Sequence, residues 1–231
     1  LIGAGNFALS TLIPEISSNK NANLLSLMSR EGLPLYIAKK KYDIGIVTTN
    51  DADFFDEIDA VFIATPHETH FDFTKKAIEL KIPVWIEKPL VISKSELISI
   101  QKKMLSNPSV YAIGYNRSLS PWTEKMKMKI NSQKSKIDIT VNAGTLPSDH
   151  WLLNKEICGG RIIGEFCHFV DLSLVLLNHT KLLNVKCLKR DKYYQDTGKY
   201  KLSFEDGSEV IIDYRHDLPA SIPKEKIVVH L

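Results

Sequence analysis

The chain has 231 residues, enough for two modest domains, and its hydrophobic content of 44% is typical of a globular protein. Its 30 basic and 27 acidic side chains nearly cancel and are scattered, which argues against a nucleic-acid or membrane partner. No apolar run approaches the length of a membrane span. The cysteines, Cys158, Cys167 and Cys187, are odd in number and lack metal-site spacing, so we expect a reducing, cytoplasmic location and no structural metal.

The middle of the first half shows a strand–helix–strand pattern. Residues 60–64 and 84–86 are short apolar runs, and apolar residues recur at helical spacing between 71 and 78. The span allows a parallel crossover, and continuous apolar strands are typical of a parallel sheet covered on both faces. Ligands of such sheets bind beyond the carboxyl ends of the strands, where Lys88 stands. Lys88 is therefore a candidate for chemistry, and a solvated loop charge is the alternative.

The chain opens with a glycine-rich turn. Residues 3–8 read GAGNFA, the G-x-G-x-x-[GA] pattern that lets a pyrophosphate approach a helix N-terminus closely. The next apolar strand, residues 24–28, ends at Ser29 and Arg30, whereas an NAD-binding strand usually ends in an acidic residue. A hydroxyl followed by a guanidinium suits a 2′-phosphate, so we expect NADP to be favoured over NAD. The acidic Glu31 leaves NAD as the alternative cofactor. The alternative for Arg30 is a surface charge that binds no ligand.

The rest of the first half continues the alternation of helices and strands. Helices are expected at residues 7–18, 33–41, 52–57 and 96–105, and further strands at 44–48 and 110–115. Pro14 should kink the first helix or split it into two short pieces. This order predicts an α/β protein whose N-terminal domain, residues 1–116, is a Rossmann-like parallel sheet covered by helices.

The second half follows a different pattern. A basic helix is expected at residues 125–130, a long helix around 165–177, and strands at 137–143, 182–190, 199–204 and 210–214. The first of these strands alternates with period two, as a half-buried antiparallel strand should, and residues 205–208 make a hairpin turn. We therefore predict an α+β domain over residues 117–231, with the long helix on an open, largely antiparallel sheet. Because its ends fall within expected strands, the chain also reads as a fragment of a longer one.

The long helix carries a second group of polar side chains. Arg161, Glu165, His168 and Asp171 recur at steps of four and three, which predicts one polar helix face, and the glycine pair at 159–160 would let a ligand approach the backbone. A single histidine on an apolar helix is more often a core residue than a catalyst. A polar stripe beside two glycines favours a functional role.

Five stretches along the chain serve as landmarks: GAGNFA, DAVFIATPHETH, EKPL, GYNRSLSP and GGRIIGEFCHFVD. Together they resemble the Gfo/Idh/MocA family of sugar and polyol oxidoreductases, and the last stretch is similar to a subgroup found in polysaccharide biosynthesis. The resemblance implies that Lys88 and His168 act together on the substrate hydroxyl. The family's usual acid four residues before the histidine is replaced by Gly164, so Glu165 is the nearest carboxylate. Ser118 stands where the family often has a second arginine.

The motifs and the resemblance together give the candidate site. The candidate catalytic residues are Lys88, His168 and Glu165. The candidate cofactor-binding residues are Gly3, Gly5, Asn6, Phe7, Ala8, Ser29, Arg30, Ala64, Thr65, Pro66, His67, His70, Glu87, Lys88 and Asn116. The candidate substrate-binding residues are Lys88, Arg117, Trp151, Arg161, His168 and Asp171. His67 and His70 form H-x-x-H, but no third ligand is near in sequence, so cofactor contact or helix capping is expected rather than a metal.

The predicted function is an NAD(P)-dependent oxidoreductase that transfers hydride between the nicotinamide and a secondary hydroxyl of a sugar, nucleotide sugar or polyol. His168 would accept the hydroxyl proton, and Lys88 would hydrogen-bond the same oxygen. Three alternatives stay open: a glycoside hydrolase that uses NAD for a transient oxidation, a dinucleotide-binding regulator without catalysis, and an inert fragment. We expect a small-molecule substrate and a homo-oligomer formed through the sheet of the second domain.

Overall fold

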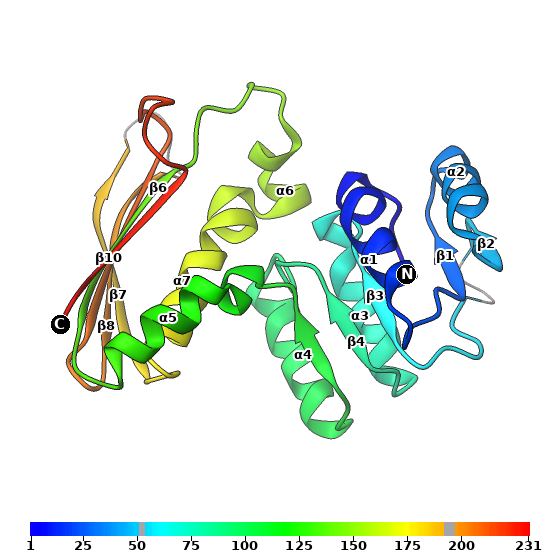
Figure 1. Cartoon of the computed structure of the whole chain (residues 1–231), viewed down its shortest axis with the longest axis horizontal. Helices are drawn as coiled ribbons and strands as arrows, with labels where there is room; N and C mark the ends of the chain where they lie inside the picture. The colour runs from blue at the N-terminus through cyan, green and yellow to red at the C-terminus, as the bar shows by residue number, and fades with distance from the viewer. Residues whose placement is uncertain (51–53, 192–196) are drawn as a thin grey trace. The chain divides into compact units, whose positions relative to one another are not determined.

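The computed structural model describes residues 1–50, 54–191 and 197–231 (Figure 1). The chain divides into two compact units, Leu1–Gly114 and Tyr115–Leu231, which are described separately below. Within the described residues, no helix is both long and apolar enough to cross a membrane.

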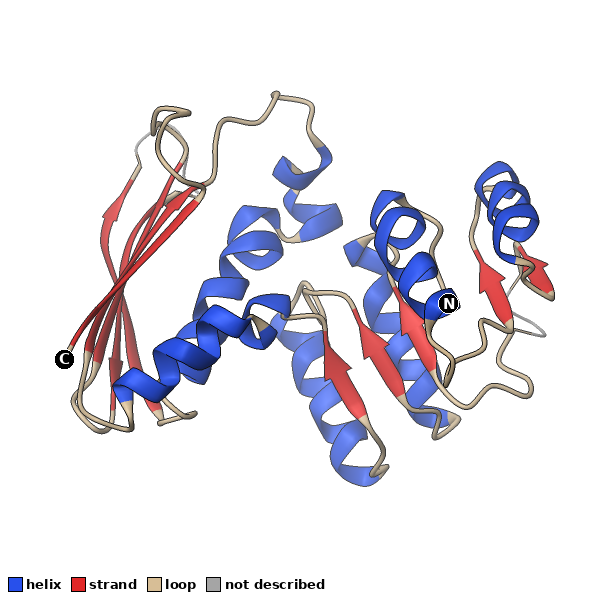
Figure 2. Ribbon diagram, viewed as in Figure 1, coloured by secondary structure: helices blue, strands red, loops and turns tan. Residues whose placement is uncertain are grey.

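The first unit alternates helices and strands in the expected order (Figure 2). Its elements are a π turn at Ala8–Leu12 that continues into α1 (Ile13–Ser18), β1 (Ser26–Met28), α2 (Gly32–Tyr42), β2 (Ile46–Thr48), β3 (Val61–Ile63), a 3-10 turn at His67–Thr69, α3 (His70–Glu79), β4 (Val84–Ile86), α4 (Lys94–Ser106) and β5 (Tyr111–Ile113). The helix expected at residues 52–57 is wrong over its described part, because residues 54–57 form a turn; the remainder lies outside the described residues.

The strands of the first unit are parallel. β1 pairs with β2, β4 lies between β3 and β5, and Ile2 bridges Met28 of β1 to Ile63 of β3. A short first strand therefore occupies the middle of the sheet, as the Rossmann prediction requires. Alternate residues of β3 enter different cores: Val61 packs with Ala77 of α3, whereas Phe62 packs with Ala8 and other residues of the first helix. This division confirms a parallel sheet with apolar cores on both faces.

Pro14 is accommodated without a break in the helix. The helical segment runs over residues 6–18, and the Ile13 amide donates to the Ala8 carbonyl, five residues earlier. Proline has no amide hydrogen and its ring crowds the carbonyl of residue i−4, so a wider turn before it relieves the conflict. The sequence predicted a kink or a split, and a π turn takes the place of the split.

The second unit combines helices with one sheet. Its elements are a 3-10 turn at Asn116–Leu119, α5 (Pro121–Ile130), β6 (Lys136–Asn142), a 3-10 turn at Trp151–Leu153, α6 (Lys155–Cys158), a π turn at Ile162–Phe166 that continues into α7 (Cys167–Leu176), β7 (Leu182–Arg190), β8 (Gly198–Phe204), β9 (Glu209–Arg215) and β10 (Glu225–His230). The strand order is β10-β6-β9-β8-β7, and every pair is antiparallel except β6 with β9.

The expectation for β6 needs a correction. Its period-two pattern predicts an antiparallel strand, which holds for its pairing with β10, but β6 runs parallel to β9. The connection from β6 to β9 is long and includes α7, which gives the chain room to return in the same direction. The predicted sheet is therefore mixed, although mostly antiparallel.

One face of this sheet forms the core of the second unit. Ile139 of β6 and Ile212 of β9 pack with Leu172 and Leu176 of α7. The other face carries charged pairs such as Lys199 with Asp213, Lys201 with Glu209, and His230 with Asp138. The alternation along each strand therefore separates an apolar face from a charged one.

Replacing Leu202 with alanine should destabilise the second unit. Leu202 is fully buried in this core, and a leucine-to-alanine cavity costs about 2–5 kcal/mol. Leu183→Ala is the matched control, because Leu183 is 58% exposed on neighbouring β7. Urea unfolding should show a clear loss of stability for Leu202→Ala only, and equal losses for both variants would contradict the core described here.

Candidate functional site

The glycine turn packs against the end of β3. Gly3 has a φ of 105°, and a Cβ on it would lie 2.3 Å from the Ala64 carbonyl oxygen. The Gly3 amide donates to the Met28 carbonyl at 2.7 Å. Only glycine tolerates both this conformation and this closeness. The first glycine of the motif therefore brings the turn against the carboxyl end of the neighbouring strand.

Gly5 has a different environment. A Cβ on Gly5 would meet no described atom within 4 Å, so the space beside this residue is open. The first helix starts here, with the Leu9 amide donating to the Gly5 carbonyl at 2.9 Å. The amides of residues 6–8 precede that first helical bond and are the groups that a helix offers to an anion. The turn therefore combines space with hydrogen-bond donors.

The segment after β3 is fixed by its own side chains. Thr69 Oγ1 donates to Thr65 Oγ1 at 2.7 Å. The His70 side chain is fully buried, and its Nδ1 and Nε2 lie 2.7 Å and 2.9 Å from the carbonyl oxygens of Pro89 and Thr65. The direct cofactor contact predicted for His70 does not fit this geometry, because both ring nitrogens face backbone. Burial lowers the pKa of His70, although the two carbonyls oppose the shift.

His67 is also buried, with its ring centroid 5.6 Å from that of His70. Across the described ranges, no three histidine, cysteine, aspartate or glutamate side chains are grouped as a metal ion would need. Within the described residues, His67 and His70 therefore lack the neighbouring third ligand that a metal site would need.

The segment after β4 carries Glu87 and Lys88. The Glu87 amide donates to the Ile63 carbonyl at 2.8 Å, which extends the β3–β4 pairing to the predicted site residue. Its side chain lies over Gly114, where a Cβ would be 2.7 Å from Glu87 Oε1. Burial raises the pKa of Glu87, and the Lys88 charge opposes the shift. Lys88 is partly buried, which argues against a fully solvated loop charge.

Ser29 and Arg30 follow β1 at the same edge of the sheet. Ser29 is partly buried and its amide donates to the Thr48 carbonyl at 3.2 Å. Arg30 is exposed, so its guanidinium is open to a ligand.

Arg161 in the second unit occupies an interior position. It is 2% exposed, and its guanidinium donates to the carbonyls of Ala143 and Gly144 at 2.7 Å and 2.8 Å and to Glu165 at 2.8 Å. The predicted substrate contact does not fit this arrangement, because the donors are directed at interior partners. Arg161 instead ties the segment after β6 to the helix that leads into α7.

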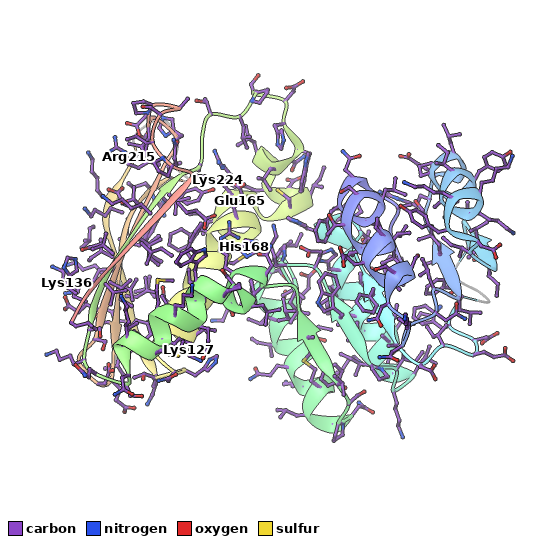
Figure 3. The ribbon with its side chains drawn as sticks, in the orientation of Figure 1. Lys127, Lys136, Glu165, His168, Arg215 and Lys224 are labelled. Carbon is purple, nitrogen blue, oxygen red and sulfur yellow. The ribbon has the colours of Figure 1, made fainter. Side chains whose placement is uncertain are left out.

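Glu165 belongs to the same cluster. Its Oε2 also accepts the Tyr214 hydroxyl at 2.5 Å, and the pKa of Tyr214 is raised by burial and by this carboxylate. The π turn changes the phase of the helix, so the predicted stripe divides into two groups rather than one face. Figure 3 shows Glu165 and His168 on successive parts of this helical segment.

The second group contains His168 and Asp171. The Tyr115 ring meets the His168 ring edge-on, with centroids 5.8 Å apart, and His168 is 8% exposed. The Ser118 hydroxyl donates to Asp171, whose pKa is raised by burial despite that bond. Burial, followed by the nearby Cys167 and Asp171, raises the pKa of Tyr115 far above its ordinary value. Tyr115 was missed from the sequence, although its place directly before Asn116 in the GYN motif was a usable signal.

The remaining candidates have different surroundings. Arg117 donates to the Glu225 carboxylate, at 3.0 Å from Nε to Oε1, and its guanidinium lies 4.8 Å from the Phe169 ring centre. Asn116 and Trp151 are exposed. The glycine pair 159–160 has positive φ and forms the turn between α6 and the following helix, which gives it a structural role. The predicted approach of a ligand to this backbone stays a prediction.

Comparison with known proteins agrees with this architecture. Residues 1–115 match the Gfo/Idh/MocA model, which describes an oxidoreductase family with an NAD-binding Rossmann fold. The chain belongs to this family.

Among curated proteins, this family member is 26% identical over 185 residues to an oxidoreductase from Formosa agariphila. It is 33% identical over 184 residues to scyllo-inositol 2-dehydrogenase (NAD(+)) from Bacillus subtilis. The alignments cover 74% and 71% of this chain but 58% and 52% of the two relatives, so the chain spans little more than half of their length.

Solved structures share the fold of this Gfo/Idh/MocA member. Myo-inositol 2-dehydrogenase from Lactobacillus plantarum has a TM-score of 0.77 at 19% identity, over 93% of this chain and 68% of that one. An oxidoreductase from Agrobacterium radiobacter, in complex with NAD+, L-tartaric acid and magnesium, has a TM-score of 0.81 at 17% identity, over 99% and 70%.

Arg161→Met should destabilise the second unit by about 3–5 kcal/mol, because it leaves Glu165 and two interior carbonyls without their cationic partner. Arg215→Met is the matched control: its ion pair with Asp217 is exposed and should contribute about 1 kcal/mol or less. Chemical denaturation of both variants checks the difference. A loss for Arg161→Met no larger than the control's would show that the interior cluster is not stabilising.

Proposed function

We propose that this chain is an NAD(P)-dependent oxidoreductase that acts on a secondary hydroxyl of a polyol or sugar. The observation that carries the proposal lies within the first unit. There the glycine turn contacts Ala64, and His70 contacts the segments that contain Thr65 and Pro89. A nucleotide-type turn and a partly buried lysine therefore belong to one connected edge of the parallel sheet, where ligands of such sheets bind.

The residues around the glycine turn fit a dinucleotide. The open space at Gly5 and the first amides of the helix suit a pyrophosphate, because the phosphate needs both room and donors. We infer that Ser29 and Arg30 receive the adenosine ribose, and that the exposed Arg30 favours a 2′-phosphate. When bound, the nicotinamide supplies the hydride acceptor or donor.

The chain's own residues manage the proton and the charge on oxygen. We infer that His168 accepts the hydroxyl proton as the substrate is oxidised, since imidazole exchanges protons near neutral pH. Lys88 donates a hydrogen bond to the same oxygen and stabilises its developing negative charge. Glu165, predicted as a catalytic carboxylate, is bound to Arg161 and Tyr214 and supports the helix that carries His168.

The names of the relatives support the substrate class. Two of the proteins that this chain resembles are named inositol 2-dehydrogenases, and inositols are polyols with secondary hydroxyls. A sugar or nucleotide sugar presents the same group, so scyllo-inositol, myo-inositol and a panel of common sugars are the first substrates to test.

Two glycine variants should separate stability from binding. Gly3→Ala should unfold the first unit more easily, because the added Cβ meets the Ala64 carbonyl in a strained conformation. Gly5→Ala has room for its methyl group and should keep its melting temperature, yet lose at least about tenfold in dinucleotide affinity because it fills ligand space. Calorimetric titration with NAD and NADP checks this, and unchanged affinity in Gly5→Ala would contradict the proposed phosphate position.

Arg30→Ala should weaken NADP selectively. It removes a charge-assisted contact to the 2′-phosphate, which NAD lacks, so affinity for NADP should fall at least about tenfold while affinity for NAD changes little. Parallel titrations of both cofactors measure the ratio. An equal loss for both cofactors would remove Arg30 from the 2′ position.

Lys88→Met and His168→Ala should each reduce kcat about a hundredfold or more, because each removes a group that acts on the reacting oxygen. The double variant should lose less than the product of the single losses, as expected of groups that act as a unit. Nicotinamide absorbance follows turnover, and Lys102→Met, an exposed lysine on α4, is the control. Full turnover in either single variant would refute the proposed roles.

A further inference from the structure

One buried side chain joins the two loops that border the proposed lysine site. His70 begins α3, and its side chain is fully buried. Its Nδ1 lies 2.7 Å from the carbonyl oxygen of Pro89, the residue directly after Lys88. Its Nε2 lies 2.9 Å from the carbonyl oxygen of Thr65, two residues after β3. The imidazole therefore spans the segments that follow two neighbouring parallel strands.

The Thr65 side of this bridge has further support. The Thr69 hydroxyl, one residue before His70, donates to Thr65 Oγ1 at 2.7 Å, and it also lies 2.8 Å from the Pro66 carbonyl oxygen. The segment after β3 is thus held by the Thr69 hydroxyl, independently of the His70 ring. On the other side of the ring, the Pro89 carbonyl oxygen faces His70 Nδ1. Loss of the His70 ring should therefore remove the Pro89 contact beside Lys88 and leave the Thr69 bonds of the Thr65 segment in place.

The protonation state limits what the ring can donate. Burial lowers the pKa of His70 and the Lys88 charge adds to this, whereas the two carbonyls and Glu68 oppose it. The buried ring of His67 is the other titratable neighbour. At neutral pH the ring is neutral and donates from one nitrogen only. The shorter contact, from Nδ1 to Pro89, is the stronger candidate for that donated bond.

We propose that His70 is a positioning residue for Lys88, which donates a hydrogen bond from Nδ1 to the Pro89 carbonyl and so fixes the turn that carries the lysine. This inference rests on the proposed function only for the catalytic role of Lys88. The contact itself is a property of the first unit. Because a misplacement of about 1 Å can cost up to about a hundredfold in rate, a small shift of this turn would be measurable.

Two conservative variants separate the two ring nitrogens. In His70→Asn the amide nitrogen takes the place of Nδ1, since both are two bonds from Cβ, and the Pro89 bond can be kept. In His70→Gln the amide nitrogen reaches about as far as Nε2, so it can replace the Thr65 contact but not the Pro89 bond. Thr74→Val is the matched control: Thr74 lies one turn along the same helix, is fully buried, and its hydroxyl makes no hydrogen bond within the described structure.

The first readout is the reactivity of Lys88, measured by brief acetylation and mass spectrometry in the absence of substrate. We expect His70→Gln to change the labelling rate of Lys88 by about threefold or more, and His70→Asn and Thr74→Val to stay within about twofold of the unmodified chain. With a substrate identified, kcat should fall at least about tenfold in His70→Gln with little change in KM for the dinucleotide. Equal Lys88 labelling in the two His70 variants, with both folded by circular dichroism, would overturn the proposal.

A second measurement needs no variant to fold. Nitrogen-15 NMR of the histidine rings in the unmodified chain reports which nitrogen of His70 carries the proton. The proposal requires the Nδ1–H tautomer near neutral pH, and a ring protonated only at Nε2 would overturn it. Neither the labelling nor the NMR result depends on turnover, so failure of the proposed function would leave this inference separately testable.

Discussion

The close approach of Gly3 to Ala64 is the constraint on which the first unit depends. It requires a glycine with positive φ, and it sets the nucleotide-type turn against the end of β3. Because the strands of this sheet are parallel, their carboxyl ends gather at one edge. The segment after β3 lies beside the turn, and the segment after β4 follows the neighbouring strand at the same edge. The fold by itself therefore brings the glycine turn and Lys88 to the same edge of the sheet.

In the second unit, the polar residues of one helical segment fall into two groups with different partners. Arg161 directly precedes the π turn at Ile162–Phe166 and binds loop carbonyls, and Glu165 within the turn binds Tyr214. His168 follows the turn and contacts Tyr115. A buried cation paired with a carboxylate and two carbonyls is strongly directional, so it fixes the backbone from which His168 projects. Glu165, the carboxylate three residues before the histidine, is thus engaged with Arg161 and Tyr214, and its catalytic role stays a prediction.

The sequence predicted the fold well because strand burial and helix periodicity leave direct traces in it, as in the apolar runs at residues 60–64 and 84–86. It also nominated Lys88 and His168 through their motifs, and their catalytic roles stay predictions. It could not show that both nitrogens of His70 face carbonyls or that Arg161 is interior, because these depend on long-range packing. The polar stripe was misjudged for a local reason: ideal helical spacing does not include the extra residue of a π turn.

The central claim is that the carboxyl edge of the first unit binds a dinucleotide with its reactive ring beside Lys88. A crystal structure of the chain grown with NAD or NADP tests this most directly. The account predicts pyrophosphate oxygens within hydrogen-bonding distance of the amides of residues 6–8, and the nicotinamide near Glu87 and Lys88. A dinucleotide bound elsewhere, or bound with its nicotinamide directed away from Lys88, would contradict it.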